Sequence, residues 1–327
     1  MRRPWLAPLT PLYAAGLAIR NFRLEHNWEP VQRLRWPVIS IGNLSTGGSG
    51  KTPLTIALAK ALTQRGFQVD VLSRGYGRKS QLPARVAPNG TADDFGDEPL
   101  LIAREARVPV CVASRRYDAG FMAEANEPGS NQPAVHLLDD GFQHRRLHRD
   151  IDILLLNRQD WHDTLLPAGN LREPIKAAHR ATVIAIPTDD PEFEAELKAW
   201  NWQGPVWRLR RKMQTPPIAG PVVAFCGIAR SDQFFAGLDA AGLQLAASIV
   251  FPDHHRYSAA DLQRLVTVAR KSGSVSLVTT EKDQVRLGKL ISTVPESLPL
   301  RTARLHIEIE NQDEAVEWLM ARARSAP

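Results

Sequence analysis

The stretch Ile41-Gly42-Asn43-Leu44-Ser45-Thr46-Gly47-Gly48-Ser49-Gly50-Lys51-Thr52 decides the fold. It lies between an apolar segment typical of a buried strand, residues 38–41, and a helical pattern over residues 53–65. A glycine-rich turn that ends in Gly-Lys-Thr at a helix N-terminus points backbone N–H groups inward, and the helix dipole favours negative charge there. The sequence therefore predicts a loop that binds the phosphates of a nucleoside triphosphate, and we expect that nucleotide to be ATP.

Two side chains at the end of this loop can contact the phosphates or a metal ion. Lys51 adds a mobile positive charge and is a candidate catalytic residue, and Thr52 can place its hydroxyl on a magnesium ion. The usual pattern begins with glycine where this chain has Ser45, so we expect Gly47 and Gly48 to supply the flexibility of the turn. The predicted nucleotide-binding residues are Thr46, Gly47, Gly48, Ser49, Gly50, Lys51 and Thr52. The loop alone does not distinguish a kinase from a GTPase or a motor.

The composition is that of an ordinary soluble protein. The chain has 327 residues, 43% of them hydrophobic and 23% charged, so it is long enough for two domains with their own cores. Cys111 and Cys226 lie in apolar segments and are expected to be reduced core residues of a cytosolic protein. The net charge is +6, but the sequence contains no recognised nucleic-acid-binding module. We therefore predict no nucleic-acid partner, and no stable protein partner is implied.

Residues 1–36 are both basic and aromatic. The residues that carry this pattern are Arg2, Arg3, Arg20, Arg23, Arg33 and Arg35, with Trp5, Leu6, Leu9, Leu12, Tyr13, Leu17, Ile19, Phe22, Leu24 and Trp28. The combination suits the surface of an anionic membrane, and the apolar run over 9–19 is too short to span one, which takes about 20 residues. Two alternatives stay open. One is a signal peptide, which the early prolines and an ATP site disfavour, and the other is an amphipathic helix packed on the protein's own core.

Apolar strands alternate with amphipathic helices along the chain. Strands are expected at 38–41, 67–72, 108–113, 135–138, 151–156 and 182–186, and again at 222–226, 245–251 and 276–280. Continuous apolar runs of this kind indicate a parallel sheet covered on both faces. We therefore predict an α/β fold: a P-loop NTPase-like parallel-sheet domain over 37–205, a connection over 206–221, and a smaller α/β domain over 222–327. Residues 207–210 and 305–309 alternate polar and apolar side chains, so they are predicted to pair as two strands between the domains.

Carboxylates follow the apolar segments of the predicted sheet. Asp139 and Asp140 come directly after a strand, where a phosphate-loop fold holds magnesium, so they are predicted metal residues together with Thr52. The alternative is a turn, since Asp-Gly is a common turn dipeptide. Asp97 opens a helix, where an acid often serves only as a cap. A kinase that phosphorylates a hydroxyl usually needs a carboxylate or His near the attacking oxygen, and Asp97 with His254 of the second domain would provide that base.

Two arginines lie near predicted turns. Arg74 follows the second strand in a glycine-containing loop, and Arg172 opens a helix after a turn. A guanidinium can hold a phosphate with two hydrogen bonds, so both are candidate ligands of a phosphate-bearing substrate. The alternatives are a solvated basic loop for Arg74 and an ordinary ion pair for Arg172.

Taken in order, these segments and others resemble the tetraacyldisaccharide 4'-kinase family, also called the lipid A 4'-kinases. The matching pieces are Gly42-Asn43-Leu44 with Gly47-Gly48-Ser49-Gly50-Lys51-Thr52-Pro53, Ser73-Arg74-Gly75-Tyr76-Gly77, Gly96-Asp97-Glu98-Pro99, Asp139-Asp140-Gly141-Phe142-Gln143-His144, Leu166-Pro167-Ala168-Gly169-Asn170-Leu171-Arg172-Glu173-Pro174, Phe251-Pro252-Asp253-His254-His255 and Glu281-Lys282-Asp283. They span residues 38 to 285, and Ser45 looks normal for this family.

The resemblance implies an activity and a site. Such enzymes use ATP and magnesium to phosphorylate the 4' hydroxyl of a tetraacylated glucosamine disaccharide 1-phosphate, giving lipid IV-A. They act at the cytoplasmic face of the bacterial inner membrane, and their active site lies in the cleft between two α/β/α domains. Carried onto this sequence, the resemblance implies that Asp97 is the base, assisted by His254. It also implies that Arg74, Arg116 and Arg172 contact substrate or phosphate.

Two other functions stay open on the sequence. One is a phosphate-loop kinase for a soluble sugar or nucleoside, which would leave the basic, aromatic N-terminus without a role. The other is a nucleotide-switch protein, either a GTPase or a metallochaperone. A switch of that type favours a guanine-specific Asn-Lys-x-Asp segment, and Glu281-Lys282-Asp283 matches it only faintly.

Overall fold

A computed structural model of the chain describes residues 3–26, 28–125 and 132–325, so Met1 and Arg2 of the basic N-terminal segment lie outside the described residues. The strands are β1 (Val38–Asn43), β2 (Gln68–Ser73), β3 (Ala84–Arg85), β4 (Val110–Val112), β5 (Ala134–Asp139), β6 (Ile151–Leu155), β7 (Val183–Pro187), β8 (Val206–Gln214), β9 (Val222–Cys226), β10 (Leu245–Val250), β11 (Ser276–Thr280) and β12 (Leu300–Ile309). The α-helices are α1 (Thr10–Glu25), α2 (Lys51–Gln64), α3 (Ala92–Phe95), α4 (Asp97–Ala106), α5 (Arg116–Ala125), α6 (Arg158–Trp161), α7 (Pro191–Ala199), α8 (Ser231–Ala240), α9 (Ala259–Lys271), α10 (Glu281–Leu287) and α11 (Gln312–Arg324). The 3-10 helices among the described residues are η1 (Pro4–Leu9), η2 (Ile175–Arg180) and η3 (Gly288–Thr293).

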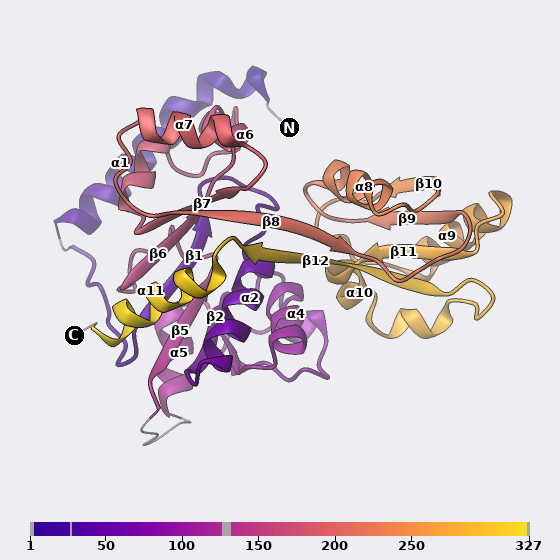
Figure 1. Ribbon diagram of the computed structural model, residues 1–327, viewed down its shortest axis with the longest axis horizontal. Helices are drawn as coiled ribbons and strands as arrows, with labels where there is room; N and C mark the ends of the chain where they lie inside the picture. The colour runs from indigo at the N-terminus through magenta and orange to yellow at the C-terminus, as the bar shows by residue number, and fades with distance from the viewer. Residues whose placement is uncertain (1–2, 27, 126–131, 326–327) are drawn as a thin grey trace.

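The described strands form one sheet in the order β10-β9-β11-β12-β8-β7-β6-β1-β5-β2-β4-β3 (Figure 1). Neighbouring strands are parallel except where β12 meets β8 and β3 meets β4. The central strand β1 is buried along its length because helices cover both of its faces. Ile41 packs with Leu54 and Leu58 of α2 on one face, and Val38 packs with Ala119 of α5 on the other. The predicted α/β fold with a parallel sheet is therefore confirmed.

The strands β8 and β12 form a long antiparallel ribbon that joins two lobes (Figure 1). Leu209 lies opposite Ile309, and Met213 lies opposite Leu305. The predicted pairing of the segments 207–210 and 305–309 as two strands is therefore confirmed, with residues 209 and 210 opposite residues 309 and 308, while residues 207 and 208 lie opposite β7. We use "large lobe" for the part built on β1 to β7, and "small lobe" for the part built on β9, β10 and β11 with α8 and α9.

Two C-terminal helices pack differently from the sequence prediction. Helix α10 lies at the junction, since its Val285 packs in the large-lobe core and its Leu287 in the small-lobe core. Helix α11 returns to the large lobe, where Val316 and Leu319 share a core with Leu54 of α2. The sequence prediction placed all of residues 222–327 in the smaller domain. The packing contradicts this for α11, because β12 carries the chain back along β8.

Helix α1 lies on the large lobe with much of its apolar surface exposed. Leu17 is buried, the Tyr13 hydroxyl donates to the Arg172 carbonyl at 2.9 Å, and Arg20 forms an ion pair with the buried Glu173. The exposed large apolar side chains of η1, α1 and the residues after them are Trp5, Leu9, Leu12, Ile19, Phe22, Trp28 and Val31. The alternative of an amphipathic helix packed on its own core thus describes only part of this segment. Among the described helices, none is both long enough and apolar enough to cross a membrane.

Candidate active site

The glycine-rich loop, residues 44–50, connects the end of β1 to the start of α2. Gly47 and Gly50 have backbone φ angles of +117° and +95°, which residues with side chains rarely adopt, so glycine is required there. Helix α2 begins at Lys51, and no described side chain caps its N-terminus, so its first N–H groups can meet an anion. Ser45 is fully buried, and its hydroxyl accepts a hydrogen bond from the Asn43 amide at 3.1 Å. That bond gives serine a structural role where glycine is usual.

A cavity of about 1250 Å³ opens beside this loop and lies between the two lobes. Its lining includes residues 45–53 of the loop and α2, Arg74, Arg116, Asp139, Asp140 and Arg172 from the large lobe, and Ala229, Arg230, Gln233, Phe234 and His254 from the small lobe. Every predicted site residue lines this cavity except Asp97. One predicted nucleotide ligand, Thr46, has its backbone N–H engaged, because it donates to the Asn170 carbonyl at 2.8 Å.

The two acids after β5 have opposite environments. Asp140 accepts hydrogen bonds from Arg172 at 3.0 and 2.9 Å and lies 3.5 Å from the Lys51 Nζ. Burial opposes ionisation of Asp140, but the charges of Lys51 and Arg172 outweigh it and hold the pKa of Asp140 well below its usual range. Asp139 accepts a long hydrogen bond from Thr55, at 3.4 Å. Burial, together with neighbouring negative charge, raises the pKa of Asp139 to about 7.

Asn43, at the end of β1, connects several predicted residues. Its side-chain oxygen accepts hydrogen bonds from the Lys51 Nζ at 2.8 Å and from Arg172 at 2.6 Å. Arg172 is therefore occupied by Asn43 and Asp140, as the ion-pair alternative expected. Sequence reasoning gave Asn43 no role. Its position at the carboxyl end of a central parallel strand, directly before the loop, is the signal that could have identified it.

Arg116 and Arg74 form a basic part of the cavity wall. Arg116 is 7% exposed, one of its terminal nitrogens donates to the Ser114 carbonyl at 3.4 Å, and its Nε has no hydrogen-bond partner among the described residues. Burial lowers the pKa of Arg116 to about 10. Arg74 is exposed and lines the same cavity. A buried guanidinium with few partners beside a second arginine suits the binding of an anion.

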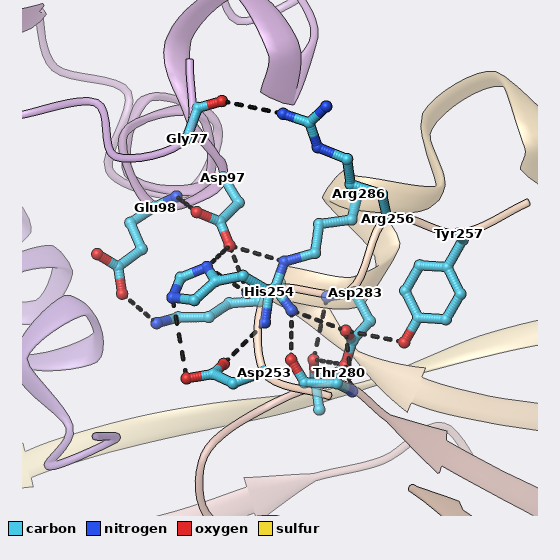
Figure 2. Close-up of polar contacts among 12 residues, drawn as sticks. Gly77, Asp97, Glu98, Asp253, His254, Arg256, Tyr257, Thr280, Asp283 and Arg286 are labelled. Atoms are coloured by element: carbon cyan, nitrogen blue, oxygen red, sulfur yellow. Dashed lines mark hydrogen bonds and ion pairs between the residues drawn. The ribbon is translucent and has the colours of Figure 1, made fainter. Parts of the chain in front are cut away.

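Asp97 of the large lobe lies among side chains of α10 and the small lobe (Figure 2). Its Oδ2 accepts a hydrogen bond from the Arg286 Nε at 2.7 Å and lies 3.2 Å from the His254 Nδ1. Burial opposes ionisation of Asp97, but the hydrogen bond with His254 and the charge of Arg286 outweigh it and hold the pKa of Asp97 below its usual range. The same hydrogen bond raises the pKa of His254. The structure thus brings together the two residues that the sequence proposed as partners.

Two basic residues of α10 contact the first turn of α4, and one of them, Arg286, was missed by sequence reasoning. Lys282 forms an ion pair with Glu98, directly after Asp97 in the chain, and Arg286 contacts Asp97 itself. Both pairs connect the first turn of α4 to α10. The segment at 281–283 was singled out from the sequence, but Arg286 was not. Its spacing of four residues from Lys282 on an expected helix would have placed the two side chains on one face.

The donor set beside the loop fits a magnesium ion. Thr52 and Asp139 both line the cavity there. In the part of the chain that the structure describes, no group of three or more His, Cys, Asp or Glu side chains is placed to hold a metal. Magnesium does not require such a group, because it keeps several waters and binds through one or two carboxylates and the phosphates of the substrate. One hydroxyl and one buried carboxylate in negative surroundings match that pattern.

Comparisons with known proteins point to one family. The family described as tetraacyldisaccharide-1-P 4'-kinase matches residues 2–324. The tetraacyldisaccharide 4'-kinase of Koribacter versatilis is 43% identical over 96% of this chain and 97% of its own length. That of Syntrophus aciditrophicus is 35% identical over 91% of this chain and 86% of its own. A crystal structure of the "apo" form of LpxK from Aquifex aeolicus in complex with ATP is similar with a TM-score of 0.75 and 31% identity, over 97% of this chain and 98% of that one.

The mixed α/β fold, the cleft and these matches define an enzyme of the kinase class. More narrowly, the chain belongs to the tetraacyldisaccharide 4'-kinase family. The resemblance expected from the ordered motifs is therefore confirmed. Membership of this family disfavours the two alternatives that the sequence left open, a kinase for a soluble sugar or nucleoside and a nucleotide-switch protein.

Proposed function

We propose that this protein transfers the γ-phosphate of ATP to the 4' hydroxyl of a tetraacylated glucosamine disaccharide 1-phosphate, giving lipid IV-A and ADP. The observation that carries the proposal is the cavity between the lobes, which the glycine-rich loop and His254 both line. Phosphoryl transfer depends on holding donor and acceptor in line and on neutralising charge, more than on covalent catalysis. The names of the relatives and the ATP in the similar crystal structure support the acceptor and the donor.

The donor side is the loop with Lys51. Asn43 and Asp140 hold the Lys51 Nζ at 2.8 and 3.5 Å, so its charge is placed beside the uncapped start of α2. The first N–H groups of that helix and the ammonium group would together bind the phosphates of ATP. The positive charge of Lys51 then stabilises the negative charge on the transferring phosphoryl group in the transition state.

Magnesium is the cofactor that fits the residues beside the loop. Asp140 is occupied by Lys51 and Arg172, so we propose Thr52 and Asp139 as the side chains that hold the ion directly. When bound, magnesium neutralises negative charge on the phosphates. Asp140 keeps Lys51 and Arg172 in place next to that site.

The Asp97–His254 pair takes the proton of the acceptor. His254 is 38% exposed on its side chain and lines the cavity, whereas Asp97 is 6% exposed behind it. His254 can therefore accept the proton while the carboxylate of Asp97 stabilises the positive charge that forms. The sequence prediction gave the base role to Asp97 itself. Because the carboxylate is not part of the cavity wall, we propose the pair as the base, with His254 as the member nearer to the acceptor.

The bond changes follow from this arrangement. As the proton passes to the pair, the hydroxyl oxygen bonds to the γ-phosphorus. The bond from that phosphorus to the bridging oxygen breaks, and ADP leaves with the electron pair. Closure of the cavity around the reactants excludes water, which otherwise competes as the acceptor.

Arg74 and Arg116 are the proposed contacts for a phosphate of the acceptor. Both line the cavity, and the buried Nε of Arg116 has no hydrogen-bond partner among the described residues, which favours an anion beside this guanidinium. Arg172 already donates to Asp140 and Asn43. We therefore propose that the main role of Arg172 is to orient Asp140, and that direct contact with the substrate is a lesser role.

The exposed face of η1 and α1 is the proposed membrane contact. Trp5 and Leu12 are 75% and 72% exposed, and Arg3 and Arg23 are exposed on the same segment. Apolar side chains can enter the head-group region while arginines pair with anionic lipids. We propose that this face rests on the cytoplasmic side of the bacterial inner membrane, so that the acyl chains of the acceptor stay in the bilayer while its sugar enters the cavity.

One assay tests the proposed function. The protein is incubated with ATP and the lipid disaccharide 1-phosphate in detergent, and the lipid is analysed by mass spectrometry. We expect a product with one added phosphate that disappears when ATP is omitted. A soluble sugar as acceptor and GTP as donor are the controls for the two alternatives. Turnover of GTP without any phosphorylated lipid would overturn the proposal.

A further inference from the structure

Arg286 lies at the centre of the cross-lobe cluster around Asp97 (Figure 2). Its side chain is 6% exposed, and its Nε donates to Asp97 at 2.7 Å. A terminal nitrogen donates to the Gly227 carbonyl at 2.5 Å and to Asp283 at 3.0 Å. One planar guanidinium therefore connects an acid of the large lobe to the Gly227 carbonyl of the small lobe and to Asp283 of α10.

Asp283 holds this arginine in place. It is fully buried and accepts hydrogen bonds from the Gly227 N–H at 3.1 Å, the Tyr257 hydroxyl at 3.0 Å and the Thr280 hydroxyl at 2.6 Å. Each of these partners belongs to a different segment of the small lobe. Arg286 is thus fixed before it meets Asp97, and a guanidinium loses little freedom when it makes hydrogen bonds in several directions at once.

The same cluster positions His254. The backbone N–H of His254 donates at 3.2 Å to the Gly227 carbonyl, which also accepts from Arg286. His254 has a φ of +57°, a left-handed conformation that a residue with a side chain keeps only when its surroundings hold it. A second nitrogen of Arg286 lies 3.2 Å from the His254 Nδ1. Arg286 therefore contacts Asp97 and also holds the turn that presents His254.

We propose that Arg286 is a positioning residue for the proton-accepting pair, one that sets both the geometry of Asp97 and His254 and the pH at which the pair can accept a proton. This inference rests on the proposed function, because it assigns Arg286 to the same reaction. It does not place Arg286 in contact with the substrate. The competing explanation is that Arg286 only holds α10 against the large lobe.

The charges around the pair give the direction of the pH effect. The charged and titratable groups that face Asp97, His254 and Arg286 are Lys282 and Asp283 on α10, Glu98 on α4, Asp253 on the turn of His254 and Tyr76 after β2. The positive charge of Arg286 lowers the pKa of Asp97 and also opposes protonation of His254. Removing that charge raises both pKa values. Since the pair must be unprotonated to act as a base, the acid limb of the rate profile moves to higher pH.

The first test compares Arg286→Gln, Arg286→Lys and the control Arg264→Gln. Arg264 is exposed on α9 of the small lobe, so its substitution removes the same charge away from the pair. For Arg286→Gln we expect kcat to fall about 100-fold with little change in the KM for ATP, and the acid limb to move to higher pH. Arg286→Lys keeps the charge, so its acid limb stays at the wild-type position while kcat falls less. An unshifted acid limb in an active Arg286→Gln variant would contradict the inference.

The second test is a double-mutant cycle with Asp97→Asn, which remains informative if Arg286→Gln lowers stability. If Arg286 acts through the pair, Arg286→Gln lowers kcat much less in the Asp97→Asn background than in the wild type. A full, additive loss in that background overturns the inference and leaves only a structural role. Thermal unfolding of each variant confirms that the folded protein is assayed. If wild type and Arg264→Gln form no phosphorylated lipid, the proposed function itself fails, so the two failures are distinguishable.

Discussion

The glycine-rich loop and the Asp97–His254 pair are built in opposite ways. The loop is one continuous stretch of the large lobe, and its conformation depends on two glycines with positive φ between β1 and α2. The pair joins residues 157 positions apart in the chain, one from each lobe, and depends on Arg286 from a third segment. The proposed donor loop is therefore built within one lobe, although small-lobe residues line the cavity beside it, whereas the proposed proton-accepting pair exists only where the lobes meet.

This difference predicts two distinct effects of substitution, one on nucleotide binding and one on proton transfer. If the proposed roles hold, we expect a substitution in the loop to weaken nucleotide binding. We expect a substitution at the lobe contact to slow proton transfer with little effect on nucleotide binding. Three substitutions test that division between the loop and the lobe contact, and a double substitution on α1 tests the proposed membrane contact.

Asp97→Asn should have the largest effect. It keeps the size of the side chain but removes the charge that stabilises a protonated His254, so we expect kcat for lipid phosphorylation to fall about 1000-fold. The KM for ATP should stay nearly unchanged, because Asp97 does not line the cavity. Steady-state kinetics with varied ATP measure both values. An equal loss in kcat and in ATP affinity would instead make Asp97 a metal or nucleotide residue.

Lys51→Ala should have the second-largest effect, and it tests the glycine-rich loop instead of the Asp97–His254 pair. Loss of an ammonium group beside the transferring phosphate is expected to lower kcat/KM for ATP about 100-fold and to weaken ATP binding as well. The matched control is Lys60→Ala, a substitution on the same helix outside the loop. If Lys51→Ala left ATP binding at the wild-type level, the loop would not be the donor site.

Arg116→Gln should affect the lipid more than the nucleotide. Its guanidinium is proposed to hold a phosphate of the acceptor, so we expect the KM for the lipid to rise about tenfold while ATP affinity stays the same. The same substitution at Arg115, its exposed neighbour, serves as the control. A change confined to ATP affinity would place Arg116 on the donor side.

Substitutions on α1 should have the smallest effect on chemistry. Leu12→Ser and Ile19→Ser reduce the exposed apolar surface, so binding to vesicles that contain anionic lipid should weaken several-fold. Activity on lipid dispersed in detergent should stay close to that of the wild type. Flotation of the protein with vesicles measures the first quantity. Unchanged flotation of the doubly substituted protein would contradict the membrane role of this face.

The parts of the site that lie close together in sequence are the parts that could be predicted. The expected strand at 38–41 extends to Asn43 in the structure, the loop follows it, and Cys111 and Cys226 are buried and free as expected. Such features depend on local spacing and on apolar runs, which a sequence displays directly.

The contacts that could not be predicted join distant segments. Arg286 and Asp97 are separated by 189 positions, and nothing in the local pattern of either indicates the other. The position of α11 on the large lobe also depends on contacts between distant segments. It follows from the pairing of β12 with β8 and from the packing of α11 against the apolar face of α2. The pairing of Asp97 with His254 was proposed because a kinase acting on a hydroxyl needs a base and because of the family resemblance. The spacing of the two residues in the sequence did not indicate that they are in contact.

The central proposal is that the loop binds the donor and the lobe contact activates the acceptor. Its most direct test is to measure ATP binding and phosphate transfer on the same samples of wild type, Asp97→Asn and Lys51→Ala. Isothermal titration gives the Kd for ATP, and a single-turnover assay with the lipid gives the rate of transfer. We predict that Asp97→Asn binds ATP like the wild type but transfers phosphate about 1000-fold more slowly, whereas Lys51→Ala loses binding as well. Equal loss of ATP binding in both variants would contradict the assignment of donor and acceptor functions to these two regions.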